Sequence, residues 1–315
     1  MRTLDWVDDR IVALDQTRLP HDVVLLDLRT VDELIDAIRT LAVRGAPALG
    51  VAGALGVALA ARTTDDVPAA AARLRAARPT AVNLAWGVDQ VLRHRGADAM
   101  LAAALRIRDD DIASSRALGA RGAEWLLDRV DGPLNIHTHC NAGALACVEW
   151  GTALGVVRAL HERDALGHVY ADETRPLLQG ARLTVWELAE MGAAHTLVAD
   201  SAGPSVIANG LVHAVVVGAD RIAANGDVVN KVGTYPLALA AHRAGIPFVV
   251  AAPESTVDMA TATGADVPIE VRADAEVTAF AGVRVAPEGT RALNYAFDVT
   301  PRDLVSAIVT EARVF

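Results

Sequence analysis

Apolar residues recur at helical spacing through much of the first 130 residues. The segment VDELIDAIRTL (31–41) shows this periodicity, and so does the segment from residue 67 to residue 77. Arg78-Pro79-Thr80 then interrupts the pattern, and Thr80 is a candidate N-cap for a helix that runs to about Leu92. Two more helices are expected over 98–108 and 112–127. The acidic run 109–111 between them is interpreted as a solvated helix start rather than a cation site.

A different pattern begins after the turn signal Asp131-Gly132-Pro133, where short apolar runs alternate with helical segments. Strands alternating with helices indicate βαβ units and a parallel sheet. We therefore predict an α/β protein with a mainly helical N-terminal domain (1–130) and a parallel-sheet domain (131–315). The expected strands are 135–139, 168–171, 196–199, 214–218 and 248–252, and the expected helices are 142–160, 184–191, 205–209 and 235–244.

Polar side chains begin within two residues of the end of each predicted strand. In open α/β sheets, ligands bind at the carboxyl ends of the strands. One such residue could be an ordinary helix cap, but five consecutive strand ends are hard to explain by packing alone, so the site is expected at this edge. The pairs and triplets concerned are Cys140-Asn141, Asp172-Glu173, Asp200-Ser201, Asp220-Arg221 and Glu254-Ser255-Thr256.

Composition excludes several classes of function. The net charge is −10 and Lys231 is the only lysine, whereas nucleic-acid binding needs clustered positive charge. The longest stretch without a charged residue or a histidine, residues 45–61, is shorter than the ~20 residues of a membrane span and is bracketed by Arg44 and Arg62, so we expect a buried helix. The first residues show no secretory pattern, and two cysteines make no disulfide framework. A cytoplasmic protein without membrane or nucleic-acid partners is expected.

The segment NIHTHCNAG (135–143) carries the most reactive side chain. A strand is expected to deliver Cys140 to the sheet edge at the start of a long helix, where a thiol can have a lowered pKa. A buried, inert cysteine is the commoner fate of this residue type, and Cys147 fits that alternative. His137 and His139 share one face of the strand. We interpret them as packed or hydrogen-bonded side chains rather than zinc ligands, because no further ligand stands at suitable spacing.

The segment VVVGADRIAANGDVVNKVGT (215–234) supplies a carboxyl group and a cation. Asp220 follows an apolar strand, and a carboxyl group partly shielded from water can act as a general acid; an ion pair with Arg221 is the alternative. Asn230 and Lys231 precede a small-residue turn and a helix. A lysine at a helix N-terminus is typical of a phosphate site, although the spacing matches no nucleotide-binding loop.

Two further segments are weaker candidates for binding. Arg44 precedes a glycine turn and a helix start in VRGAPALG (43–50), which would suit an anion but is also an ordinary helix entry. The polar segment 172–182 follows a strand and is expected to be an active-site loop; a surface loop with internal ion pairs is the alternative.

Taken in order, these segments resemble the 5-methylthioribose-1-phosphate isomerases of methionine salvage. That family shares a superfamily with ribose-1,5-bisphosphate isomerases and with regulatory subunits of a eukaryotic translation-initiation exchange factor. The resemblance spans nearly the whole chain, and its longest strings are the most specific. The matching strings are DQTRLP (15–20), VRGAPALG (43–50), RPTAVNL (78–84), THCNAGALA (138–146), YADETRPLLQGARLT (170–184), VGADRIAANGDVVNKVGTY (217–235), PESTVD (253–258) and AFDVTP (296–301).

The resemblance implies a small N-terminal domain, a Rossmann-like C-terminal domain and a homodimer that acts on a sugar phosphate without a metal or other cofactor. It puts Cys140 and Asp220 on the catalytic positions. It also adds Gln179, which the residues alone do not single out. The substrate-binding positions that it implies are Arg44, Gly45, Ala46, Arg78, Gln179, Asn230 and Lys231.

The implied reaction converts an aldose phosphorylated on its anomeric carbon into a ketose 1-phosphate. Proton transfer through Cys140 and a direct hydride shift both remain open. So do other substrates, 5-deoxyribose 1-phosphate or ribose 1,5-bisphosphate; the absence of a second lysine argues against the bisphosphate. The stretch 200–204 departs from the family pattern at a strand end, which leaves the substrate's 5-substituent open. A non-enzymatic regulatory subunit should lack the Cys140/Asp220 pair, and a Rossmann dehydrogenase should show GxGxxG after a strand, which is absent.

Overall fold

A computed structural model of the chain describes residues 2–79 and 81–315. The predicted cap Thr80 lies outside the described residues. The chain divides into two compact units, which are described separately: unit 1 comprises the residues up to Ala117 together with Ala142–Gly155, and unit 2 comprises Leu118–Asn141 and Val156–Phe315. The predicted domain division into 1–130 and 131–315 stays a prediction.

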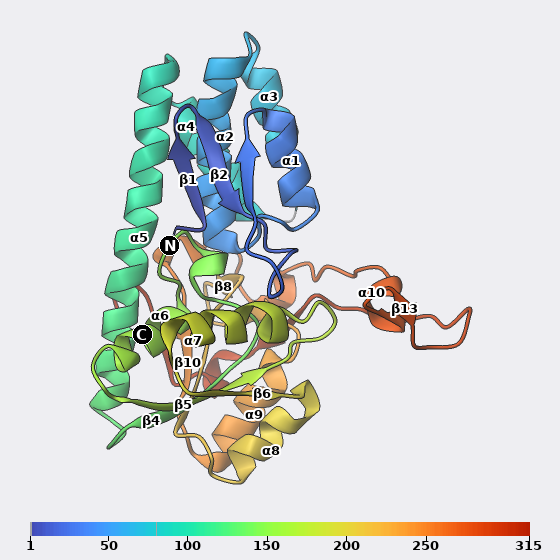
Figure 1. Ribbon diagram of the computed structural model, residues 1–315. Helices are drawn as coiled ribbons and strands as arrows, with labels where there is room; N and C mark the ends of the chain where they lie inside the picture. The colour runs from blue at the N-terminus through green and yellow to red at the C-terminus, as the bar shows by residue number, and fades with distance from the viewer. Residues whose placement is uncertain (1, 80) are drawn as a thin grey trace. The chain divides into compact units, whose positions relative to one another are not determined.

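Unit 1 opens with a three-stranded antiparallel sheet that no sequence pattern predicts. Its strands β1 (Leu4–Val7), β2 (Arg10–Leu14) and β3 (Leu25–Leu28) are neighbours in that order (Figure 1). The strands have only four or five residues each, and charged residues interrupt them, so no clear alternation of polar and apolar positions marks them.

The helices of unit 1 follow the predicted periodicity. They are α1 (Val31–Arg39), α2 (Ala46–Thr63), α3 (Val67–Arg75) and α4 (Val82–Leu92). Thr30 caps α1 through a reciprocal pair of hydrogen bonds with Glu33, which satisfies backbone donors that a helix start otherwise leaves open.

Helix α2 is long and apolar enough to cross a membrane, yet 72% of it is buried inside the protein. It packs against α4 so closely that a Cβ atom on Gly87 would overlap the carbonyl oxygen of Gly50. Small residues allow this approach, and the interpretation of residues 45–61 as a buried helix is confirmed.

Helix α5 (Ala97–Leu127) corrects one prediction. It is a single helix of 31 residues, and the acidic run 109–111 lies in its interior rather than at a helix start. Asp109 and Asp110 are exposed, and Asp109 pairs with Arg108 at 2.7 Å. An exposed aspartate costs a helix only about 0.7 kcal/mol, which packing along the rest of the helix readily offsets.

Unit 2 contains a six-stranded sheet in the order β15-β10-β7-β4-β5-β6, and every neighbouring pair is parallel. Helix α7 (Val185–Met191) lies on one side of this sheet, and α8 (Gly203–Ala208) and α9 (Thr234–Ala244) lie on the other (Figure 1). The predicted α/β class and the five predicted strands are confirmed. The strands are β4 (Leu134–Thr138), β5 (Leu166–Asp172), β6 (His195–Val198), β7 (Ala214–Val217), β10 (Phe248–Ala251) and the unpredicted β15 (Ala307–Val309).

A second, four-stranded sheet of unit 2 has the order β11-β8-β9-β14 and was not predicted. Its strands are β8 (Arg221–Ala223), β9 (Val228–Lys231), β11 (Val257–Asp258) and β14 (Phe297–Thr300). Strand β9 carries Asn230 and Lys231 and pairs antiparallel with β14. Between β11 and β14 the chain forms the short helix α10 (Ala275–Thr278) and the hairpin of β12 (Ala279–Phe280) and β13 (Val283–Arg284).

The single helix predicted over 142–160 is wrong. A short 3₁₀ helix, η1 (Ala144–Ala146), is followed by irregular chain, and α6 (Ala153–His161) begins only then. Gly143 and Gly151 form a β-bridge, and Gly151 takes a φ of 91°, which closes the chain into a loop instead of a helix.

Candidate functional site

Strands β4 and β7 are neighbours at the point where the strand order of the large sheet reverses. The chain runs from β4 outward to β5 and β6, returns to the other side of β4 with β7, and continues outward to β10 and β15. Parallel sheets of this kind bind ligands in the crevice beyond the carboxyl ends of the two strands at such a reversal. Cys140 lies two residues beyond β4 and Asp220 three residues beyond β7, and the register pairs His137 with Val215. The two predicted catalytic side chains therefore follow the two strands that border this crevice.

Cys140 is half-buried and takes a left-handed backbone conformation, with φ at 60°. Its N–H donates to Thr174 Oγ1 at 2.9 Å, and its carbonyl accepts from Thr184 Oγ1 at 2.6 Å. Thr174 is also left-handed, at 64°. Non-glycine residues held in this region cluster at functional sites. The helix N-terminus that was expected to lower the pKa of the thiol is absent, as described above, whereas Cys147 is buried as predicted.

Asp220 is exposed, so the predicted shielding of its carboxyl group is wrong. Its backbone N–H donates to Val229 O at 2.9 Å, which fixes the start of β8 against β9. The neighbouring Arg221 forms an ion pair with Asp258 at 3.2 Å. Two residues of irregular chain, the buried Gly218 and the half-buried Ala219, separate the end of β7 from Asp220.

A buried network of two histidines and one carboxylate lies beside the Cys140 backbone. His137 Nε2 contacts Asp172 Oδ1 at 2.9 Å, and His139 Nδ1 contacts Asp172 Oδ2 at 2.8 Å. The second nitrogen of His139 reaches the carbonyl oxygen of Val232 at 2.8 Å. All three side chains of the network are almost completely buried, so the prediction of packed, hydrogen-bonded histidines is confirmed.

Within this network His139 favours its positively charged form and Asp172 its negatively charged form. Burial works against a charged His139, but the hydrogen bond and the charge of Asp172 outweigh it and raise the pKa of the imidazole above its ordinary value. Burial likewise opposes a charged Asp172, but the hydrogen bonds from His137 and His139 lower the pKa of that carboxyl group. A protonated His139 paired with an ionised Asp172 follows from both directions.

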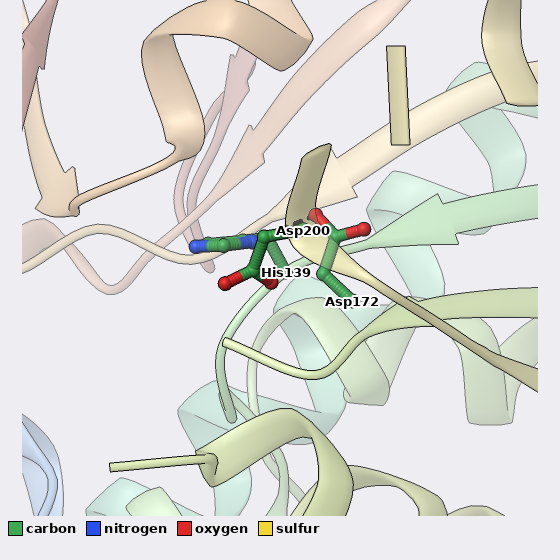
Figure 2. Close-up of side chains that lie close together, drawn as sticks. All are labelled: His139, Asp172 and Asp200. Carbon is green, nitrogen blue, oxygen red and sulfur yellow. Dashed lines mark hydrogen bonds and ion pairs between the residues drawn. The ribbon is translucent and has the colours of Figure 1, made fainter. Parts of the chain in front are cut away.

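The side chains of His139, Asp172 and Asp200 lie close together (Figure 2). Their ligand atoms are within 4.8 Å of one another, a geometry that a metal ion could use. Their atoms are already engaged, however. Asp200 accepts hydrogen bonds from the backbone N–H groups of Thr174 and Arg175 at 2.7 and 2.6 Å, and both oxygens of Asp172 accept from histidines. A metal ion would have to break these bonds, so the group is better described as a hydrogen-bonded network.

Asn230 and Lys231 end β9 and are both buried. Asn230 Nδ2 donates to Thr234 Oγ1 at 2.9 Å, and that hydroxyl donates to the Lys231 carbonyl at 2.7 Å. Lys231 Nζ lies 4.6 Å from the ring centroid of Phe297, a cation–π contact. The ammonium group of Lys231 is thus held within the protein rather than in bulk solvent.

The N-terminus of α9 is not open to an anion, which corrects part of the predicted phosphate site. Asp298 Oδ2 accepts from the N–H groups of Gly233 and Tyr235 at 2.8 and 3.1 Å. Burial raises the pKa of Asp298, while these backbone N–H groups and the charge of His139 oppose that rise. An anion at this turn must therefore rely on Lys231 and Asn230 rather than on these helix amides.

Gln179 directly precedes a π-helical turn, η2 (Gly180–Thr184), and turns of this type are frequent at functional sites. Its side chain is 8% exposed, and its Oε1 is buried without a hydrogen-bond partner among the described residues. Gly180 is essential to this turn, because a Cβ atom there would overlap the Asp172 carbonyl oxygen. No local sequence pattern marks Gln179; only the fold shows its unsatisfied acceptor.

The other four predicted binding residues belong to unit 1. Gly45 is the N-cap of α2 with φ at 100°, and a Cβ atom there would overlap the backbone of Ala146. Arg44, Ala46 and Arg78 are half-buried. Unit 2 carries the remaining five: Cys140, Asp220, Gln179, Asn230 and Lys231.

Comparisons with known proteins identify the relatives of this chain. Residues 42–315 match the model of the initiation factor 2 subunit family. A Nocardia farcinica protein, named probable bifunctional methylthioribose-1-phosphate isomerase/methylthioribulose-1-phosphate dehydratase, is 56% identical over 98% of this chain, which spans only 58% of its length. The methylthioribose-1-phosphate isomerase of Anaeromyxobacter sp. strain Fw109-5 is 54% identical, with 97% of this chain and 91% of that protein covered.

Two solved structures agree with the fold. The 5-methylthioribose 1-phosphate isomerase of Pyrococcus horikoshii has a TM-score of 0.93 and 40% identity, with 99% of this chain and 92% of that chain covered. A protein from A. fulgidus, described as the delta subunit of the translation initiation factor eIF-2B, has a TM-score of 0.90 and 42% identity, with coverages of 100% and 95%. The chain therefore belongs to the initiation factor 2 subunit family, in the group whose members are named methylthioribose-1-phosphate isomerases.

Proposed function

We propose that this protein is an aldose–ketose isomerase that converts 5-methylthioribose 1-phosphate to 5-methylthioribulose 1-phosphate. The observation that carries the proposal is the adjacency of β4 and β7 at the reversal of strand order, because Cys140 and Asp220 follow these two strands. The names of relatives at 54–56% identity support the choice of substrate.

Asp220 opens the sugar ring in this proposal. A phosphate on the anomeric carbon prevents the ring from opening to a free aldehyde by itself. Asp220 in its protonated form gives a proton to the ring oxygen as the bond from that oxygen to C1 breaks. Because Asp220 is exposed in the ligand-free protein, the bound substrate itself must displace water from it before the carboxyl group acts as an acid.

Cys140 moves the hydrogen. Its thiolate removes the proton from C2, which gives an enediol-type intermediate. The same proton or one from solvent then adds to C1, while the C2 hydroxyl becomes the ketone and its proton returns to the ionised Asp220, directly or through solvent. In the competing route a hydride passes directly from C2 to C1, and Cys140 only shields the reacting carbons. The two routes differ in whether the hydrogen can exchange with solvent.

The binding residues divide between cations and hydrogen-bonding groups. Lys231 and Asn230 come from β9, and Lys231 supplies the positive charge for the phosphate. The buried, unpartnered Oε1 of Gln179 suits a sugar hydroxyl donor. The resemblance implies four more substrate-binding residues, Arg44, Gly45, Ala46 and Arg78, all of which belong to unit 1.

One assay separates this proposal from its alternatives. The purified protein is incubated with 5-methylthioribose 1-phosphate, 5-deoxyribose 1-phosphate and ribose 1,5-bisphosphate in parallel, and ketose formation is followed by NMR. We expect the highest kcat/KM on the methylthio sugar. Equal rates on the deoxy sugar would make the substrate assignment wrong, and no turnover of any sugar would favour a regulatory role, as the name of the A. fulgidus protein suggests for that protein.

Methionine salvage, a cytoplasmic location and a homodimer belong to the same proposal. The segment 259–295 exposes several large apolar side chains, which contact with a second copy would bury. Light scattering during gel filtration would detect a monomer if the dimer is wrong. The most exposed of these side chains are Leu293, Met259, Val283 and Val285, at 73%, 71%, 66% and 63%.

A further inference from the structure

In unit 2, His139 connects two parts of the proposed site: the loop that carries Cys140 and the turn that follows Asn230 and Lys231. It directly precedes Cys140 in the chain, and its ring reaches the turn: Nε2 lies 2.8 Å from Val232 O, one residue beyond Lys231. Gly233 lies against the same ring, since a Cβ atom on Gly233 would come within 2.7 Å of His139 Cε1. One side chain therefore spans from the thiol-bearing loop to the turn that follows Asn230 and Lys231.

Hydrogen-bond chemistry fixes the protons on this ring. A backbone carbonyl can only accept, so Nε2 of His139 must carry a proton to bond with Val232 O. The contact from Nδ1 to Asp172 Oδ2 needs a second proton, either on the imidazole or on the carboxyl group. Asp172 also accepts from His137 at its other oxygen, and two donors stabilise the ionised carboxylate.

His137 plays a different part, although it contacts the same carboxylate. Its Nδ1 is buried without a hydrogen-bond partner among the described residues, so a proton there would be an unsatisfied donor. The geometry therefore identifies Nε2 as the donor of His137, toward Asp172. The carboxylates that face His139 electrostatically are Asp172, Asp200 and Asp298, from three different segments, and all of them favour its charged form.

We propose that His139 is a positioning residue: a doubly protonated imidazole that holds the turn 230–234 in register with Cys140, so that the phosphate group and the reacting carbons of the substrate are bound at a fixed separation. Only the expected effect on KM rests on the proposed isomerase function; the protonation of His139 does not. The charge of His139 remains inside the protein, balanced by Asp172, and does not touch the substrate.

Two substitutions of His139 each keep one of its two hydrogen bonds and remove the other. In His139→Asn the amide nitrogen stands in for Nδ1, so the bond to Asp172 is kept and the bond to Val232 O is lost. In His139→Gln the longer side chain stands in for Nε2, so the bond to Val232 O is kept. We expect His139→Asn to raise KM for the sugar phosphate by ~10-fold, the scale of one hydrogen bond, with kcat changed less than about threefold. His139→Gln should leave KM the closer of the two to wild type.

His137→Gln is the matched control, because it keeps a donor to Asp172, and among the described residues His137 has no hydrogen bond to the turn. Its KM should equal that of the wild type. A purely structural role of the network would instead lower the yield or melting temperature of all three variants and leave KM of the folded protein unchanged, and that outcome would overturn the inference.

A spectroscopic test on the wild-type protein is independent of turnover. In ¹H–¹⁵N spectra of the ligand-free protein at neutral pH, one histidine should carry protons on both ring nitrogens, and its signals should vanish in His139→Gln. A singly protonated His139 would refute the charge assignment even if the isomerase assay succeeds. A doubly protonated His139 in a protein that turns over no sugar phosphate would refute the proposed function instead.

Discussion

Gln179 buries a polar atom that the ligand-free protein leaves unsatisfied. Burying an acceptor without a partner costs ~1–3 kcal/mol, and such a cost at a predicted binding position is expected where a substrate donor completes the bond. We predict that Gln179→Leu raises KM for the sugar phosphate by ~10-fold or more, while the unfolding free energy of the ligand-free protein stays equal or rises.

Steady-state kinetics and urea unfolding on the same preparation check this prediction. Gln179→Glu is the control of similar shape, and its added negative charge should weaken phosphate binding further. A Gln179→Leu protein with normal KM would show that Oε1 does not face the substrate.

Cys140 and Asp220 should carry the chemical step. We predict that Cys140→Ser and Asp220→Asn each lower kcat by ~10²-fold or more, the usual scale for acid–base groups. Substrate deuterated at C2 then separates the two routes: loss of deuterium to solvent indicates proton transfer, and full retention indicates a hydride shift. Near-normal turnover in either variant would remove that residue from the mechanism.

For single residues, the sequence predicts which side chains belong to the site better than it predicts the surroundings of each side chain. The position after a strand marks Cys140 and Asp220, and the alternation along one strand marks His137 and His139 as packed partners. The environment of each depends on contacts with distant segments. Neither the exposure of Asp220 nor the unsatisfied acceptor of Gln179 has a local signal.

Helix α9 offers a test at the scale of one element, because left-handed glycines lie at both of its ends. Gly233 has φ at 106° and contacts His139, whereas Gly245 has φ at 70° and open space around it. We predict that Gly245→Ala costs only the left-handed conformation, about 1 kcal/mol. Gly233→Ala should cost more and also raise KM, because the methyl group displaces His139.

Urea unfolding and KM measured on both variants decide this comparison. Equal losses of stability at the two ends, with KM unchanged in both, would mean that the contact between Gly233 and His139 carries no function.

Elements with strong periodicity are predictable, and those that depend on distant pairing are not. The strands β7 and β10 are continuous apolar runs because both faces are covered, and they stand out in the sequence. The strands of β1–β3 and of the four-stranded sheet have two to five residues, too few for an alternation to be recognised. The order of strands, which creates the crevice, is set by the connections and has no sequence pattern of its own.

The buried pair of His139 and Asp172 makes the stability of the whole protein depend on pH. The pKa of His139 is raised above 6.5, so its contribution is complete below that pH and is lost as the pH rises through the folded value. The pKa of Asp172 is lowered below 3.8, so its contribution is present above that pH and is lost as the pH falls through its folded value. The pair stabilises the protein most between these limits.

We predict that Asp172→Asn destabilises the protein by ~3–5 kcal/mol near pH 6, the scale for breaking a buried ion pair, and by less well above the folded pKa of His139. Thermal unfolding from pH 4 to pH 10 checks this dependence, with His168→Gln as a control at a histidine outside the network. A loss of stability that is constant with pH would contradict a charged pair.

The left-handed backbone of Cys140 has a consequence for how this protein can evolve. Only glycine adopts that conformation without a penalty, so Cys140→Gly should unfold at a higher denaturant concentration than Cys140→Ala, by the equivalent of ~1 kcal/mol, although neither can form a thiolate. Without selection for turnover, substitution of Cys140 by glycine would thus be favoured, because it gives a more stable but inactive protein. A relative that keeps cysteine at this position is therefore still under selection for catalysis.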